Sequence, residues 1–326
     1  MKNRENLFKK YLLLYVKALG VGAADAVPGI SGGTVAFITG IYEELINSLR
    51  SLTLKNLIKL LTFKLKAFWK GINGNFLLTV FLGIATSLIL LANIVLEMLD
   101  TYPIATWSFF FGLILISTVS VLRTIREVTM PVVIAFGAGA VVAYLITLLS
   151  AAQTPNELWF IFICGAVAIC AMILPGISGS FILLLLGKYQ YVLGALADFK
   201  MDIIAVFAGG AAIGLLSFSH FLSWLLRKYH DVTVALLAGF MFGALNKVWP
   251  WKVQTNPETN ETWQWTMERF SDHSLTLKES SHLPHTFELI TGVEANLYVG
   301  LASAATAIII FKIIEFIGNR KKQTDN

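Results

Sequence analysis

Two short stretches carry the same run of residues, and that run is suited to binding an anion. One reads VPGISGGTVAFITGIYEELI at 27–46, and the other reads LPGISGSFILLLLGKYQYVL at 174–193, at a constant offset of 147. Pro-Gly stops a helix, and the Ser-Gly that follows starts a new one whose first backbone N–H groups lack intrahelical partners. Such a start carries about half a positive charge and favours phosphate or carboxylate. The expected phosphate-binding residues are Gly29, Ser31, Gly32, Gly33, Thr34, Gly176, Ser178, Gly179 and Ser180.

We call residues 26–34 the first break and residues 174–180 the second break. A single break of this kind could serve packing alone, since small residues let membrane helices approach closely. Two breaks that both keep the proline, inside apolar sequence where a broken helix is costly, favour a transport site instead.

Asp25 is a charged residue directly before the first break. It lies among Ala, Val and Gly, and an intramembrane carboxylate is costly unless it is paired or functional. Its counterpart in the second copy is Met172, so the charge is not duplicated. Two interpretations stay open: Asp25 binds a coupling proton or sodium ion, or it pairs with a base such as Lys17 or Arg123.

Other chemistry has little support in the sequence. The chain has no Ser-His-Asp order with supporting context, no phosphate-binding P-loop and no metal-ligand cluster. Cys164 and Cys170 are six residues apart and do not share a helix face. We therefore expect no enzyme activity, no cofactor and no metal.

Composition indicates a membrane protein that lies in the bilayer along its whole length. Hydrophobic residues make up 56% of the 326 residues and charged residues only 14%. Several apolar runs reach the roughly 20 residues that a helix needs to cross a bilayer. The formal charge of +5 is better explained by basic cytoplasmic segments than by nucleic-acid binding.

The elements around the breaks predict an all-α polytopic membrane protein with two inverted-topology repeats. Each repeat is a re-entrant helical hairpin plus about three transmembrane helices. A second arm at 34–46 is only about 20 Å long, too short to cross the bilayer alone. Lys17 interrupts the apolar run 8–26, which we expect to be retained structure and not a signal peptide.

The predicted boundaries divide the chain at its middle. The first repeat, 1–150, holds hairpin 8–46, an interfacial basic amphipathic helix at 53–70, and spans 75–98, 103–122 and 130–150. The second repeat, 158–318, holds hairpin 158–193, spans 203–226, 232–249 and 295–317, and an extracytoplasmic loop at 250–294.

Charge supports the inverted arrangement. With both termini cytoplasmic, the inner segments hold 18 Lys and Arg residues and the outer segments six. Loop 250–294 falls outside, with seven acidic and three basic residues. This is the bias of the positive-inside rule, and it brings the two breaks together from opposite faces.

The residues also carry a family resemblance. Residues 22–34, GAADAVPGISGGT, followed by Gly40-Ile41-Tyr42-Glu43, resemble the signature of the polyprenyl-phosphate transporter family, and so does the second copy with Gly187-Lys188-Tyr189. The resemblance implies a flippase in the bacterial cytoplasmic membrane. It would move undecaprenyl phosphate from the outer to the inner leaflet for reuse in cell-wall synthesis.

Two other functions remain open from the residues alone. One is a secondary transporter of a small soluble anion, which could use the same breaks. The other is a membrane factor that assists enzymes acting on lipid carriers. The partners expected are polyprenyl-phosphate lipid, a coupling proton or sodium ion, and membrane lipids, with no nucleic acid.

Overall fold

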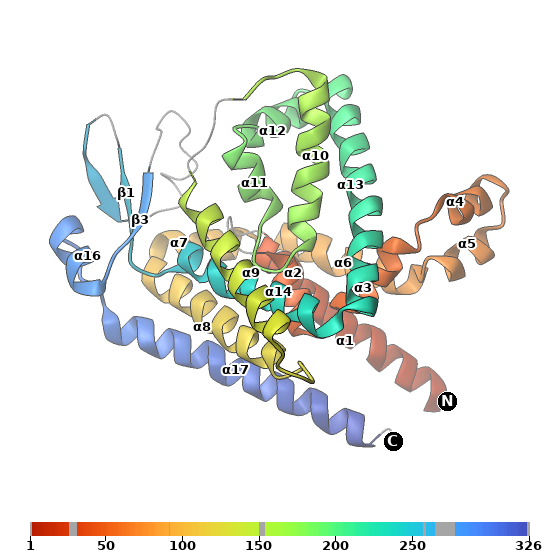
Figure 1. Cartoon of the computed structure of the whole chain (residues 1–326), viewed down its shortest axis with the longest axis horizontal. Coiled ribbons are helices and arrows are strands. Elements are labelled where there is room, and N and C mark those ends of the chain that lie inside the picture. The colour runs from red at the N-terminus through yellow and green to blue at the C-terminus, as the bar shows by residue number, and fades with distance from the viewer. Residues whose placement is uncertain are drawn as a thin grey trace.

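The structure is a computed structural model that describes residues 2–25, 31–90, 92–149, 154–256, 259–264 and 278–324. These residues are mostly helical, and a small sheet lies at one end of the molecule (Figure 1). The helices of the first half are α1 (Lys2–Asp25), α2 (Gly32–Ile38), α3 (Tyr42–Arg50), α4 (Leu54–Leu61), α5 (Leu65–Gly71), α6 (Gly74–Leu90), α7 (Ala92–Thr101), α8 (Pro103–Leu122) and α9 (Met130–Leu148).

The second half repeats short and long helices and then adds the sheet. Its elements are α10 (Leu158–Ile173), α11 (Gly179–Leu185), α12 (Tyr189–Ala197), α13 (Met201–Lys228), α14 (His230–Gly243), the 3-10 helix η1 (Ala244–Val248), β1 (Lys252–Thr255), β2 (Thr262–Gln264), β3 (Lys278–Ser281), α16 (Pro284–Thr291) and α17 (Leu297–Thr324).

Four of the described helical segments are long and apolar enough to cross a membrane. They are α8, α9, α13, and α14 continued by η1, and they coincide within a few residues with the ranges 103–122, 130–150, 203–226 and 232–249. Two bent pairs could add two more spans: α5 with α6, bent by 72°, and α11 with α12, bent by 110°. The protein is therefore a multi-pass membrane protein with four to six candidate spans among the described residues.

The arms that follow the breaks are themselves broken, which the sequence did not predict. Each expected arm, 34–46 and 178–193, falls on two helices in place of one. The first helix has seven residues and the second nine, and their bounds recur at the offset of 147. Gly40 and Gly187 lie at the divisions with φ of +71° and +61°. Glycine adopts this left-handed backbone without the Cβ clash that other residues meet, so the chain turns there.

One other predicted helix is also divided in the structure. The basic segment 53–70 forms α4 and α5, separated at Phe63, which has φ of +53°. The expected span 75–98 is covered by α6 up to Leu90 and by α7 from Ala92, with Leu91 outside the described residues. Helix α1 begins at Lys2, ahead of the expected start at residue 8.

The helices pack in pairs that lie close together at glycines. A Cβ added at Gly210 of α13 would lie 1.9 Å from the carbonyl oxygen of Phe162 in α10, and one at Gly239 of α14 would lie 2.2 Å from that of Phe136 in α9. Helices α1 and α6, and α8 and α17, form the other extensive pairs. Such close packing by small residues is a principal source of helix association in lipid.

A small antiparallel sheet follows η1, within the loop expected at 250–294. Its strand order is β2-β1-β3, and Val253 of β1 lies opposite Gln264 of β2 and Ser280 of β3. Trp251, Val253 and Phe287 are buried together with Ile104 of α8, so the sheet and α16 pack onto the helical part. In Figure 1 the sheet and α16 lie at the opposite end of the molecule from α4 and α5.

Candidate functional site

The two breaks contact each other, although they are far apart in the chain. The hydroxyl oxygen of Thr34 accepts a hydrogen bond from the Gly176 backbone N–H at 2.8 Å. The hydroxyl of Ser31 donates to the carbonyl oxygen of Leu174 at 3.2 Å. The backbone is equally close, since a Cβ added at Gly33 would lie 2.9 Å from the carbonyl oxygen of Ile173. The expected meeting of the two breaks is therefore present in the structure.

The start of α2 is occupied by side chains close to it in the sequence. Ser31 has the extended backbone of an N-cap, and its hydroxyl oxygen accepts the Gly33 N–H at 3.1 Å. The carboxylate of Asp25 accepts the Gly32 N–H at 2.6 Å. A Cβ at Gly32 would lie 2.4 Å from that carboxylate, so glycine is needed for this approach. Asp25 thus supplies the anion at this helix start.

The two bases considered as partners for Asp25 lie in different surroundings. The ammonium group of Lys17 donates to the carbonyl oxygen of Thr39 at 2.6 Å. Arg123 is exposed at the end of α8, where its charge interacts with Glu315 of α17. Arg123 is therefore not brought into the cluster that holds Asp25 and the first break.

The second break has a different polar arrangement. Ser178 has the same extended backbone as Ser31 but makes no capping hydrogen bond to α11, and its hydroxyl instead bonds that of Ser180 at 2.8 Å. Gly176 has φ of +88°, and a Cβ there would lie 2.6 Å from the carbonyl oxygen of Phe240. Gly179 packs against α10, 2.5 Å from the Ala168 carbonyl by the same measure. With Met172 in place of an acid, this helix start differs chemically from the first.

Three hydroxyl groups of the breaks are closed off from solvent, and that of Ser180 is half-buried. Ser31, Thr34 and Ser178 are only 2%, 1% and 6% exposed. Gly29 lies outside the described residues. The described conformation is therefore a closed one, in which hydroxyl, carboxylate and backbone groups of the two breaks satisfy one another. A ligand anion would reach the N–H groups only after these contacts separate.

One contact was missed from the sequence at the place where the two breaks meet, which we call the junction. The Tyr42 hydroxyl is buried and donates to the carbonyl oxygen of Ile173 at 3.1 Å, so α3 also holds the end of α10. The signal was available, because Tyr42 and Tyr189 recur at the offset of the breaks. Among the described residues, no group of three or more His, Cys, Asp or Glu side chains is placed to hold a metal.

Comparison with known proteins decides the family. Residues 21–265, which include both breaks, match a family model described as "Undecaprenyl phosphate translocase-like". The chain belongs to this family. It is a family of transporters and not of enzymes.

Two curated relatives carry the same name. A protein of Vibrio cholerae serotype O1 called "Polyprenyl-phosphate transporter" is 46% identical over 303 residues, covering 92% of this chain and 95% of the relative. A "Polyprenyl-phosphate transporter" of Staphylococcus aureus is 30% identical over 258 residues, covering 72% of this chain and 85% of the relative. No solved structure matches the chain.

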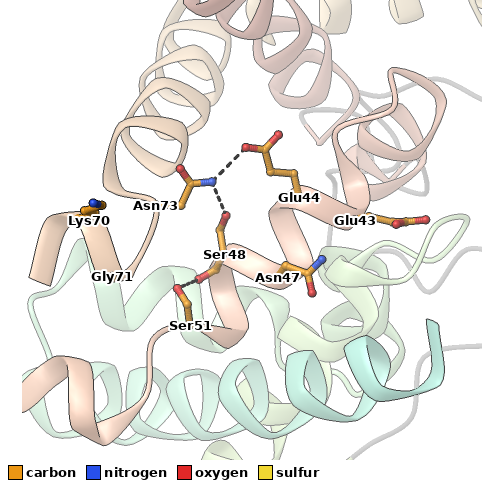
Figure 2. A pocket seen from close by; sticks show the side chains of 8 residues that line it. All are labelled: Glu43, Glu44, Asn47, Ser48, Ser51, Lys70, Gly71 and Asn73. Atoms are coloured by element: carbon orange, nitrogen blue, oxygen red, sulfur yellow. Dashed lines mark hydrogen bonds between the residues drawn. The ribbon is translucent and has the colours of Figure 1, made fainter. Parts of the chain in front are cut away.

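A polar pocket of about 430 Å³ lies away from the breaks, between α3 and the end of α5 (Figure 2). Figure 2 shows the Asn73 side chain donating to Glu44 at 3.0 Å and to Ser48 at 3.1 Å. Glu43 and Glu44 line the pocket together with Lys70, so carboxylates outnumber the cation, which disfavours a phosphate ligand. It is therefore a poor alternative to the breaks as an anion site.

Proposed function

We propose that this protein is a polyprenyl-phosphate transporter that carries its lipid across the bacterial cytoplasmic membrane. The observation that carries the proposal is the direct contact between two duplicated helix breaks, through Thr34 and Gly176. Membership of the translocase-like family and the names of both curated relatives support the substrate. Following the family resemblance, the lipid is undecaprenyl phosphate, moved from the outer to the inner leaflet for reuse.

The proposal includes two inverted repeats with both termini cytoplasmic. Helix lengths of seven and nine residues recur at an offset of 147, which supports duplication. The excess of Lys and Arg in the segments assigned to the inside supports inversion. In Figure 1 both ends of the chain lie on the side of α4 and α5, opposite the sheet and α16, as this topology requires.

In this mechanism the phosphate headgroup crosses at the junction of the breaks while the polyprenyl tail stays in lipid. The headgroup displaces the Asp25 carboxylate from the Gly32 N–H and the Ser31 and Thr34 hydroxyls from their partners across the junction. Backbone N–H groups and hydroxyls are the donors that phosphate favours. The duplicated break offers the headgroup similar donors from either face, as alternating access requires.

Asp25 is the proposed site of ion coupling. A carboxylate beside an incoming phosphate is repelled by it, and a proton or sodium ion on Asp25 removes that repulsion. We therefore propose that one of these ions enters with the headgroup. The measurement is transport by Asp25→Asn under imposed proton and sodium gradients. Loss of gradient dependence with a folded protein supports the role, and unchanged dependence contradicts it.

The substrate is tested with purified protein in proteoliposomes. Movement of polyprenyl phosphate between leaflets is compared with uptake of a small soluble anion, inorganic phosphate, into the same vesicles. The proposal predicts protein-dependent lipid movement without phosphate uptake. Phosphate uptake without lipid movement would instead identify a soluble-anion transporter. Absence of both would leave a factor that assists lipid-carrier enzymes.

A further inference from the structure

Two lysines are buried where the sheet joins the helical part. Lys247 of η1 is 7% exposed and Lys252 of β1 is 2% exposed. Both ammonium groups lie against the same carboxylate oxygen of Glu279 in β3, at 2.6 Å and 3.7 Å. Lys252 also donates to the backbone carbonyl of Lys247. The two cations and the carboxylate form one compact cluster, which we call the outer lysine cluster.

The cluster contacts both α11, which follows the second break, and α8. The Lys247 ammonium is 4.3 Å from the ring centroid of Phe181, in the first turn of α11. The Lys252 ammonium is 4.9 Å from the ring of Trp107 in α8. Aromatic faces stabilise a cation without supplying a negative charge. The cluster therefore places one of its two cations, Lys247, against the first turn of α11, directly after the second break.

The Glu279 carboxylate is shared by two buried cations. Removing an ammonium group from water is costly, and here burial lowers the pKa of Lys252 to about 7 against the opposing effect of Glu279. A carboxylate brings one negative charge to the pair. A phosphate monoester brings about 1.5 to 2 negative charges and three acceptor oxygens, which lets each lysine bind its own oxygen.

We propose that Lys247 and Lys252 form a phosphate-monoester site on the outer side, and that Glu279 holds this site until the phosphate displaces it. The Glu279 carboxylate would then act as an internal anion that occupies the site until the phosphate binds. This inference rests on the proposed function for the source of the phosphate, the headgroup of an outer-leaflet lipid. Free inorganic phosphate has the same chemistry, and the experiment separates the two sources.

The experiment measures binding to the full chain in nanodiscs, with polyprenyl phosphate in the lipid or inorganic phosphate in solution. Glu279→Gln removes the competing charge and should bind polyprenyl phosphate about tenfold more tightly than wild type. Lys247→Met and Lys252→Met should each bind it about tenfold more weakly. Lys278→Met is the matched control, because Lys278 is exposed on the same strand, and it should stay within about twofold of wild type. Thermal melting of each variant reports folding.

The outcomes separate this site from the proposed function. If Glu279→Gln binds no more tightly and both lysine variants bind like wild type, while wild type still moves the lipid, the site is wrong and the function stands. If wild type binds inorganic phosphate through these lysines but neither binds nor moves the lipid, the site stands and the function is wrong. Should a lysine variant fail to fold, Glu279→Gln decides alone, because an ion pair with a purely structural role predicts weaker or unchanged binding.

Discussion

At the scale of single residues, the junction is a set of polar groups that satisfy one another. Asp25 and Ser31 take the first N–H groups of α2, and Thr34 takes the N–H of Gly176. Each such hydrogen bond contributes about 1 kcal/mol net, and a buried group left without its partner costs about 1–3 kcal/mol. The junction is thus stable when closed and weak enough to open for a ligand that replaces the same bonds.

Thr34→Val tests the bond between the two breaks. Valine keeps the shape but leaves the Gly176 N–H without its acceptor, so we expect a loss of about 1–3 kcal/mol in stability and a lower melting temperature. Thr79→Val is the control, since the exposed Thr79 hydroxyl donates to the carbonyl of Asn75 within its own helix. Equal melting of both variants in detergent would contradict the account.

Lys252 predicts how stability changes with pH. Burial lowers its pKa to about 7 in the folded protein, from the 10.5 that is ordinary for a lysine. Between pH 7 and pH 10.5 the unfolded chain keeps the proton on Lys252 that the folded protein has lost. The free energy of unfolding therefore rises with pH, by at most about 1.4 kcal/mol per pH unit. Below pH 7 both states are protonated at this group and its contribution is constant.

Lys252→Met should remove this rise. We expect the wild-type melting temperature to increase from pH 7 to pH 9 relative to that of Lys252→Met, measured in the same detergent. Lys278→Met should keep the wild-type slope, since Lys278 is exposed on β3. The same slope in Lys252→Met and wild type would show that the buried ammonium does not control this titration.

At the scale of elements, the sequence identified breaks that proline forces and missed those that depend on glycine. Pro175 cannot continue α10, and a new helix begins at Gly179 as expected. Gly40 and Gly187 stand within apolar runs that a continuous helix could also accommodate. In the structure each glycine has a left-handed backbone, and the next N–H bonds back into the helix, from Ile41 to Ala36 and from Lys188 to Leu183. A glycine permits such a helix end but does not force it, so the sequence left these two divisions undecided.

Adjacent glycines in α13 test the packing of the helix pairs. A Cβ at Gly210 would lie 1.9 Å from the Phe162 carbonyl oxygen, whereas one at Gly209 would lie 3.8 Å from the Phe162 ring. Gly210→Ala should force α10 and α13 apart and lower the melting temperature by several degrees, a cost of about 1–3 kcal/mol. Gly209→Ala should melt like wild type or slightly higher. Identical behaviour of the two variants would contradict the described crossing.

At the scale of the whole molecule, hydropathy predicted four of the spans that the structure contains. The excess of Lys and Arg in the segments assigned to the inside predicts an orientation that stays a prediction, and it treated Lys247 and Lys252 only as topology signals. Their burial depends on the sheet, and strands of three or four residues leave little periodicity to detect. The meeting of the breaks was predictable from duplication, whereas the Asp25 carboxylate at the α2 start required the structure.

The most direct test of the central claim, that the headgroup crosses at the junction of the breaks, is leaflet-resolved transport of polyprenyl phosphate in proteoliposomes. The methyl group of Gly32→Ala would lie only 2.4 Å from the Asp25 carboxylate and would clash with it. The methyl group of Gly194→Ala would meet no atom within 4 Å. We predict that wild type and Gly194→Ala move the lipid at rates within about twofold, and that folded Gly32→Ala is at least about tenfold slower, equivalent to about 1.4 kcal/mol. Lipid movement by Gly32→Ala at the wild-type rate would contradict the account.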